Sequence, residues 1–282
     1  MTGFINVNKQ AGDSSAKEVA KIKRLSGVSC GHMGTLDPMA SGVLPVALGN
    51  AARLFDYFLS KQKTYVATFR FGEDYDTLDT TGTLITGGGR VPDRNEIEKV
   101  IPNLVGEILQ LPPKYSAKNV NGKRGYQLAR AGVEFELPPK KVTISSIKLL
   151  NQTDENSFSF EIECGGGTYI RSIARDMAKM LGTCAAMSAL IRTKSGPFTI
   201  ENSVQTDDLN SENLNNYIIP CDSLLPFDSI HAQGLTAKKI FNGLSAPCDY
   251  PDGTYKLYNQ DGNFYGLAAV CGGVLKVRIK LC

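Results

Sequence analysis

Hydrophobic and polar residues alternate over several short segments, and this period of two is typical of β-strands with one buried face. The clearest example is residues 65–71, Tyr-Val-Ala-Thr-Phe-Arg-Phe, and residues 4–7 alternate in the same way. Residues 43–48 are continuously apolar, which suits a fully buried strand. Two further strands are predicted at residues 142–150 and 157–164, joined by a polar turn.

Apolar residues at helical spacing, bounded by capping residues, predict a smaller number of helices. The first helix follows the capping sequence Asp13-Ser14-Ser15, and another begins with the cap-like Asp93. Gly132 and Gly182 stand where two of the helices end. The predicted helices cover residues 16–25, 93–104, 124–131 and 169–181.

The predicted strands outnumber the helices, and short turns join neighbouring strands. We therefore expect an α+β fold with a mixed, mostly antiparallel central sheet flanked by helices. Residues 199–231 are polar and acidic with little apolar pattern, so we interpret them as a connector with one helix near residues 207–214.

The last part of the chain has a pattern of its own. It contains a short helix at residues 236–241 and short strands separated by Asp-Gly at 252–253 and 261–262, which is a hairpin signal. We predict two domains, residues 1–231 and a small β-rich domain at 232–282.

Charge is unevenly distributed, although the formal net charge is only +3. Residues 110–150 contain eight Lys or Arg and two acidic residues, and residues 164–198 contain five and one. Residues 199–231 contain six acidic residues and no Lys or Arg. Basic segments of this kind bind phosphates. The alternative is an ordinary solvated surface.

Cysteine and histidine usage narrows the class of protein. The seven cysteines are odd in number and form no Cys-x-x-Cys pair, so we expect free thiols. His32 and His231 are the only histidines, and no His/Cys spacing suits zinc, so we expect no metal. No apolar run has the length of a membrane span, and the first residues lack a secretory pattern, so we expect a cytoplasmic protein.

Asp37 is the first candidate for chemistry. It lies in the segment Gly-His-Met-Gly-Thr-Leu-Asp-Pro at residues 31–38. Glycines permit backbone geometry closed to other residues, so this segment can hold a carboxylate in a fixed pose beside a substrate. The alternative is structural, because Asp-Pro is a common turn or helix start. His32 alone is equally typical of a surface or core histidine.

Three further segments combine aromatic, basic and glycine residues. Tyr65 opens a strand, where its ring can stack on an unpaired base and its hydroxyl can exchange a proton, although a core tyrosine is the alternative. Residues 111–132 mix basic and aromatic residues with turn formers, which suits RNA or simply a solvated loop. Three glycines at 165–167 lead into the helix that carries Arg171, and a helix N-terminus favours anions.

The segment at residues 189–198 completes the set of candidates. There we expect Leu190 in the core and Arg192 and Lys194 on the surface.

In this order and at these separations, the segments resemble the bacterial tRNA pseudouridine synthases of the TruB family, which act on uridine 55 in the T arm. Gly-His-x-Gly-Thr-Leu-Asp-Pro-x-Ala-Ser-Gly-Val-Leu-Pro carries the resemblance, and Pro-Pro-Lys-Tyr-Ser-Ala and Gly-Thr-Tyr-Ile-Arg-Ser reinforce it. The similarity runs from Phe4 to about Phe198. It implies the pseudouridine synthase catalytic fold, a T-arm-binding insertion at about residues 110–150, a PUA-like RNA-binding domain at 232–282, and no cofactor or metal.

The resemblance also implies roles for individual residues. Asp37 would be the catalytic nucleophile, Tyr65 would pack on the target base, and Arg171 would pair with Asp37 and keep it charged and placed. His32 would help to hold the flipped-out conformation of the T loop. The remaining predicted substrate-binding residues are Tyr169, Leu190, Lys114 and Lys118. The chain departs from the family at Val28-Ser29-Cys30 and at Gly166, where basic residues are common, and these changes remove phosphate contacts.

The implied reaction breaks the N1–C1′ bond of a uridine, rotates the uracil and rejoins it through C5. Asp37 can attack ribose C1′, attack uracil C6 or assist a glycal route, and the sequence leaves all three open. Two other functions also stay open, namely a catalytically inert RNA-binding relative and a guide-dependent synthase. Because segment 110–130 resembles the T-arm-binding insertion, we favour a stand-alone monomeric enzyme acting on tRNA.

Overall fold

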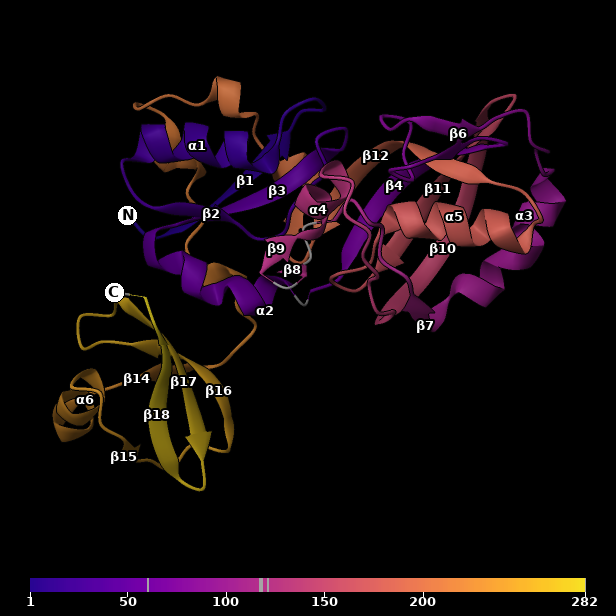
Figure 1. Cartoon of the computed structure of the whole chain (residues 1–282). Helices are drawn as coiled ribbons and strands as arrows, with labels where there is room; N and C mark the ends of the chain where they lie inside the picture. Colours follow the sequence, from indigo (N-terminus) through magenta and orange to yellow (C-terminus); the bar gives the residue numbers. More distant parts are fainter. Residues whose placement is uncertain (60, 117–118, 121, 282) are drawn as a thin grey trace.

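The computed structural model describes residues 1–281 except residues 60, 117, 118 and 121. Its centre is a nine-stranded sheet, shown in Figure 1. All pairings in this sheet are antiparallel except that of β3 with β12, which confirms the predicted mixed, mostly antiparallel sheet. The path through the sheet is β1 (Gly3–Lys9), β3 (Ser41–Leu48), β12 (Ala185–Ser195), β4 (Lys63–Phe71), β11 (Ser157–Cys164), β10 (Lys140–Asp154) and β7 (Gly106–Gln110), with β2 (Cys30–His32) on β3 and β13 (Phe198–Thr199) on β12.

Helices α1 (Ser15–Ser26), α3 (Arg94–Val100) and α5 (Ile170–Met180) cover one face of the sheet, and their apolar side chains join one continuous core with those of the strands. Figure 1 shows α5 lying across β4, β11 and β10. Two short ribbons lie outside the main sheet, β5 (Asp74–Tyr75) with β6 (Leu84–Thr86) and β8 (Asn119–Val120) with β9 (Lys123–Arg124). The helices are α1 (Ser15–Ser26), α2 (Phe55–Leu59), α3 (Arg94–Val100), α4 (Gly125–Arg130), α5 (Ile170–Met180) and α6 (Gly234–Phe241), and the 3₁₀ turns are Gly49–Leu54, Ile101–Leu104, Ile200–Asn202, Thr206–Asp208, Leu214–Tyr217 and Asp222–Leu224.

Ser14 and Asp93 start α1 and α3 as predicted, and α1 ends at Gly27, a glycine that the prediction did not name. Ser14 caps α1 by accepting a hydrogen bond from the amide of Lys17, and Gly27 ends it with φ 70°. Asp93 and Glu96 form a reciprocal capping box at the start of α3. These local signals explain why the helix positions were predictable from the sequence.

Strand β3 is buried on both faces, as its continuous apolar run predicts. Leu44, Val46 and Leu48 belong to the core under α1, α3 and α5. Val43 and Ala47, on the opposite face, belong to a second core with residues of α2 and of the C-terminal sheet. This double burial holds the segment that precedes β3 between two packed layers.

Residues 140–154 form β10 of the main sheet, so the segment that leaves the sheet after β7 is residues 111–139. It contains the ribbon β8–β9 and helix α4, which Figure 1 shows near the middle of the molecule. The predicted Lys118 lies outside the described residues.

The connector contains no α-helix at residues 207–214, so that prediction is wrong. The described chain there forms 3₁₀ turns at Thr206–Asp208 and Leu214–Tyr217. Asn210 accepts hydrogen bonds from the backbone amides of Glu212 and Asn213, and Asn213 donates to the carbonyl of Asp208. Side chains of this type compete with helical hydrogen bonds, which is the physical reason for the difference.

The C-terminal region forms a five-stranded sheet with α6 packed on it. The Asp-Gly at 261–262 connects the antiparallel strands β16 and β17, as predicted. The Asp-Gly at 252–253 makes no hairpin, because β15 pairs with β18 and not with β16. The domain boundary predicted at residues 231 and 232 stays a prediction. The strand order is β14 (Ser229–His231), β16 (Gly253–Tyr258), β17 (Phe264–Cys271), β18 (Val274–Lys280) and β15 (Ala246–Pro247).

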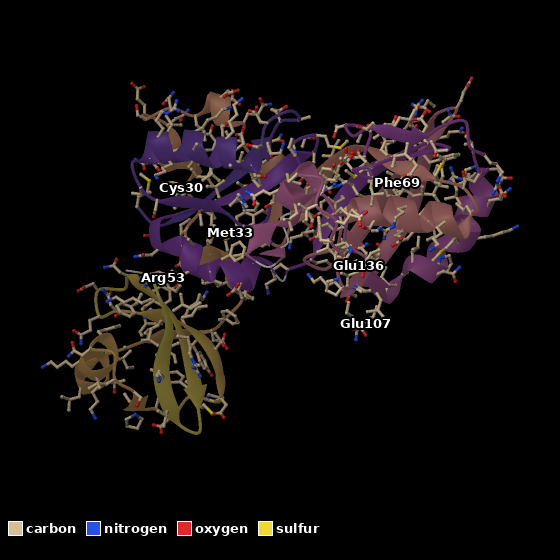
Figure 2. The ribbon with its side chains drawn as sticks, viewed as in Figure 1. Cys30, Met33, Arg53, Phe69, Glu107 and Glu136 are labelled. Atoms are coloured by element: carbon tan, nitrogen blue, oxygen red, sulfur yellow. The ribbon has the colours of Figure 1, made fainter. Side chains whose placement is uncertain are left out.

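The small sheet is tied to the large one by its last strand. Arg53 donates to the carbonyl of Lys280 at 2.7 Å and Asn50 to that of Leu281 at 3.1 Å. Figure 2 labels Arg53 at this junction. Leu267 and Leu281 pack into the second core behind β3. The junction thus combines apolar contact with hydrogen bonds from side chains to backbone carbonyls.

Gly42 permits the close crossing of β3 and β12. Its φ is +98°, and a Cβ built there would lie 2.3 Å from the carbonyl oxygen of Arg192. We expect Gly42→Ala to lower the free energy of unfolding by about 3 kcal/mol in urea titrations. Gly12→Ala is the matched control, because Gly12 also has a positive φ but no atom near its missing Cβ. Equal losses in the two variants would contradict the contact argument.

Candidate active site

Five of the predicted site residues line one pocket of about 270 Å³. They come from the loop before β3, from β4, from the start of α5 and from β12. The sheet order explains the grouping, because β3, β12 and β4 are consecutive neighbours. The five residues are Asp37, Tyr65, Tyr169, Arg171 and Leu190.

Asp37 is held in place by contacts to its backbone neighbours. Its carbonyl accepts from the amide of Ala40 at 3.0 Å, so the Asp-Pro turn considered from the sequence is present. On one side of it, the hydroxyl of Ser15 bonds both the amide and the carbonyl of Leu36. On the other side, the buried ammonium of Lys9 donates to the carbonyl of Pro38. The carboxylate itself is 35% exposed and opens on the pocket.

Arg171 connects Asp37 to two other segments. Its Nε lies 3.0 Å from Oδ2 of Asp37, and its Nη1 lies 3.5 Å from Oδ2 of Asp79. The same guanidinium donates to the carbonyls of Thr77 at 2.8 Å and Tyr115 at 3.0 Å. The side chain is 7% exposed, so its charge is balanced and its N–H groups are occupied inside the protein. The ion pair expected between Arg171 and Asp37 is present in the structure.

Asp79 is a site residue that the sequence reasoning missed. Its side chain is 6% exposed and accepts hydrogen bonds from the hydroxyls of Thr77 and Thr81 and from the amide of Thr81. Leu78, between Thr77 and Asp79 in the chain, is the one non-glycine among the described residues with positive φ, at 61°. Backbone strain of this kind persists where the surroundings hold it. The run Asp-Thr-Leu-Asp-Thr-Thr at residues 76–81 is the only sequence signal that pointed here.

Tyr65 lies at the start of β4, paired with Arg192 of β12, and is 7% exposed. Burial raises the pKa of its hydroxyl above the ordinary value. The neighbouring guanidinium of Arg192 acts in the opposite direction through its charge and a side-chain hydrogen bond. The ring and hydroxyl of Tyr65 therefore face the pocket in a dry setting beside a fixed cation.

Arg192 is buried at 1% exposure, so the prediction that it lies on the surface is wrong. Its guanidinium donates to the carbonyls of Val43 at 2.7 Å, Gly34 at 3.1 Å and Thr35 at 3.5 Å. A strand in the middle of the sheet turns alternate residues inward, and the loop before Asp37 supplies carbonyls that only a donor can satisfy. Arg192 thus fastens this loop to β12.

Lys63 also lines the pocket and is 4% exposed. Its ammonium donates to the carbonyl of Lys61 at 2.6 Å. Burial, together with the charge of Arg192, lowers the pKa of Lys63 to about 8. It lies two residues before Tyr65 on the same face of β4.

Two other predicted substrate-binding residues, His32 and Lys114, do not line this pocket. His32 is half-buried on β2, and its Nδ1 has no hydrogen-bond partner among the described residues. Burial lowers the pKa of His32. Lys114 borders a different, larger hollow with Glu134 and Glu136, in the segment that leaves the sheet. Lys118 is among the residues that the structure does not describe.

Within the described part of the chain, no three His, Cys, Asp or Glu residues cluster as metal ligands. The six cysteines of that part are free, as expected. No described helix is long and apolar enough to cross a bilayer.

Comparison with known proteins connects this geometry to a family. Residues 17–170 match the model described as TruB family pseudouridylate synthase (N terminal domain), and residues 171–226 match that of the tRNA pseudouridylate synthase B C-terminal domain. A tRNA pseudouridine synthase B of Clostridium kluyveri is 38% identical over 95% of each chain. The protein of that name from Acaryochloris marina is 37% identical over 100% of this chain and 99% of its own.

Solved structures agree in fold. The crystal structure of a Cbf5-Nop10-Gar1 complex superposes with a TM-score of 0.73 over 99% of this chain and 85% of that chain, at 24% identity. That of the archaeal box H/ACA sRNP Nop10-Cbf5 complex gives 0.71 over 99% and 86%, also at 24%. At this identity the likeness shows a shared fold.

The contacts of Arg192 predict a large cost of removing it. Arg192→Met leaves the carbonyls of Gly34 and Val43 buried without a donor, so we expect a loss of about 2–4 kcal/mol in the free energy of unfolding. Arg94→Met is the matched control, because Arg94 is 51% exposed and its ion pair with Glu98 lies at the surface. Urea titrations measure both, and a similar small loss in the two variants would refute the tie between loop and strand.

The lowered pKa of Lys63 predicts a dependence of stability on pH. Between about pH 8 and pH 10.5 the lysine is protonated in the unfolded chain and neutral in the folded one. Below about pH 8 it is charged in both states, and the burial of this charge lowers the free energy of unfolding. This penalty disappears as the pH rises. Relative to Lys63→Met, we expect the original protein to gain about 2–3 kcal/mol of unfolding free energy between pH 7 and pH 10. A difference that stays constant over this range would contradict the buried charged state.

Proposed function

The chain belongs to the TruB family of pseudouridylate synthases and isomerises uridine to pseudouridine in tRNA, and from this premise we propose that the target is uridine 55 in the T arm and that Asp37 is the nucleophile. The observation that carries this proposal is the ion pair of Asp37 with Arg171, at 3.0 Å, in a pocket shared with Tyr65 and Leu190. A uridine in a folded loop reaches such a pocket only when it is flipped out.

Asp37 has the geometry of a held carboxylate. Arg171 contacts Oδ2, and Oδ1 forms no hydrogen bond or ion pair with the described residues, so one oxygen is fixed and the other is left for the nucleotide. The carboxylate forms a bond to the nucleotide and later leaves, either at ribose C1′ or at uracil C6, or it assists a glycal route.

The walls of the pocket do the remaining work. The ring of Tyr65 stacks on the uracil, and its hydroxyl relays a proton when C5 loses its hydrogen. A tyrosine hydroxyl is protonated at neutral pH and burial raises its pKa further, so Tyr65 accepts the C5 proton only as it passes its own proton to water, while uracil N1, released from C1′, gains a proton. Leu190 and Met187 line the pocket and exclude water, so the detached uracil is recaptured and not lost to hydrolysis.

The T arm is met by basic residues around the mouth of the pocket. Residues 111–139 leave the sheet beside it and contain Lys114, and Arg175 of α5 donates to the carbonyl of Leu111 in the same segment. His32, Tyr169 and these cations contact the loop and its phosphates. The enzyme acts on tRNA in the cytoplasm as a monomer, without cofactor or guide RNA.

The nucleophile assignment predicts a clean separation of binding from chemistry. Asp37→Asn keeps the shape of the side chain but removes its charge, so we expect no pseudouridine at position 55 and RNA affinity within about threefold of the original protein. The measurement is pseudouridine mapping on a T-arm transcript, with binding measured in parallel. Turnover by the original protein on transcript alone, with no added protein or guide, distinguishes a stand-alone enzyme from a guide-dependent or inert relative. Full activity of Asp37→Asn would overturn the assignment.

A further inference from the structure

Ser116 presents a buried hydroxyl to the pocket that contains Asp37. The residue is 4% exposed and lines the same pocket as Asp37. Its Oγ has no hydrogen-bond partner among the residues that the structure describes. A hydroxyl that loses water without gaining a partner lowers stability, so the position calls for a ligand that supplies one.

The place of Ser116 is set by the contacts of its neighbours. The carbonyl of Tyr115 accepts from Nη2 of Arg171, and the hydroxyl of Tyr115 donates to Asp76 at 3.2 Å. The amide of Ser116 donates to the carbonyl of Lys114 at 3.0 Å. Across from it stands Gly125, whose missing Cβ would come within 3.3 Å of Oγ of Ser116. The backbone of Ser116 is therefore held in a fixed position, with Gly125 packed closely against it on one side.

Ser116 and Asp37 are positioned by contacts to the same side chain. One guanidinium, that of Arg171, binds the carboxylate of Asp37 and the carbonyl of the residue before Ser116. A nucleotide placed against Asp37 thus meets a hydroxyl whose position relative to the carboxylate is fixed by a single side chain.

We propose that Ser116 hydrogen-bonds an oxygen of the flipped-out uridine, either the ribose 2′-hydroxyl or a carbonyl of the uracil. This inference rests on the proposed function. A serine hydroxyl both donates and accepts, so it fits either group. Rotating uracil about its N3–C6 axis exchanges O2 with O4, so a donor at one fixed point meets a carbonyl oxygen before and after the rotation. The 2′-hydroxyl does not move with the base, so that contact also persists.

The test compares the effects of Ser116→Ala on thermal stability and on catalytic activity, which we expect to differ. Ser116→Ala removes an unpartnered hydroxyl, so we expect the melting temperature to stay or rise while kcat/KM on a T-arm hairpin falls about tenfold. Ser172→Ala is the matched control for stability, because Ser172 is also buried but donates to the carbonyl of Leu111 at 2.9 Å, and its melting temperature should fall. An unchanged kcat/KM in Ser116→Ala, or a fall in its melting temperature like that of Ser172→Ala, would overturn the inference.

A second substrate distinguishes the two oxygen sources. The original protein and Ser116→Ala are compared on a hairpin with 2′-deoxyuridine at the target position. A contact to the ribose predicts that the substitution makes no further difference on this substrate, and a contact to the uracil predicts that the tenfold loss persists. On the unmodified uridine hairpin, an inactive original protein would overturn the proposed function itself, whereas an active one with an unaffected Ser116→Ala would overturn only the role of Ser116.

Discussion

The guanidinium of Arg171 is the contact on which the site depends. It is buried at the start of α5, and it satisfies two carboxylates and two backbone carbonyls from three separate segments of the chain. Removing one partner from a buried cation leaves its charge incompletely compensated. The contacts of Arg171 therefore hold the three segments in place together. Asp79 is the buried partner and Asp37 the partly exposed one. Arg171 is therefore fixed by a buried carboxylate and at the same time positions the carboxylate that lines the pocket.

A second buried cation, Arg192, holds the loop that contains Asp37, as Arg171 holds the Asp37 carboxylate. Arg192 of β12 binds the carbonyls that precede Asp37 and also lies beside Tyr65. The loop packs through Met33, Leu36 and Ala40, which belong to the cores on the two faces of β3. Its polar backbone groups are fixed by hydrogen bonds to Lys9, Ser15 and Arg192, which belong to β1, α1 and β12. The active-site geometry is in this way an extension of the sheet and its first helix.

Most secondary structure was predictable because it depends on neighbours in the chain. The period-two segments became strands and the capped segments became helices, including the capping box of Asp93 and Glu96. The failures occurred where local signals compete. Asn210 and Asn213 turned a predicted helix into 3₁₀ turns, and the Asp-Gly at 252–253 was followed by a strand that pairs elsewhere. Which strands pair is decided by the packed sheet and not by the turn alone.

Motif and order in the sequence determined the family, the candidate nucleophile Asp37 and its expected partner Arg171, since these residues stand in segments with few alternatives. Only the tertiary structure decided which polar groups are buried. Arg192 lies in the interior and not on the expected surface, Lys63 and Ser116 line the pocket, and Asp79 is a buried partner of Arg171. The physical reason is that the identity of a charged or hydroxyl-bearing residue does not show whether its side chain contacts water or a buried carbonyl. Its role is set by partners that lie far away in the chain and near only in the folded protein.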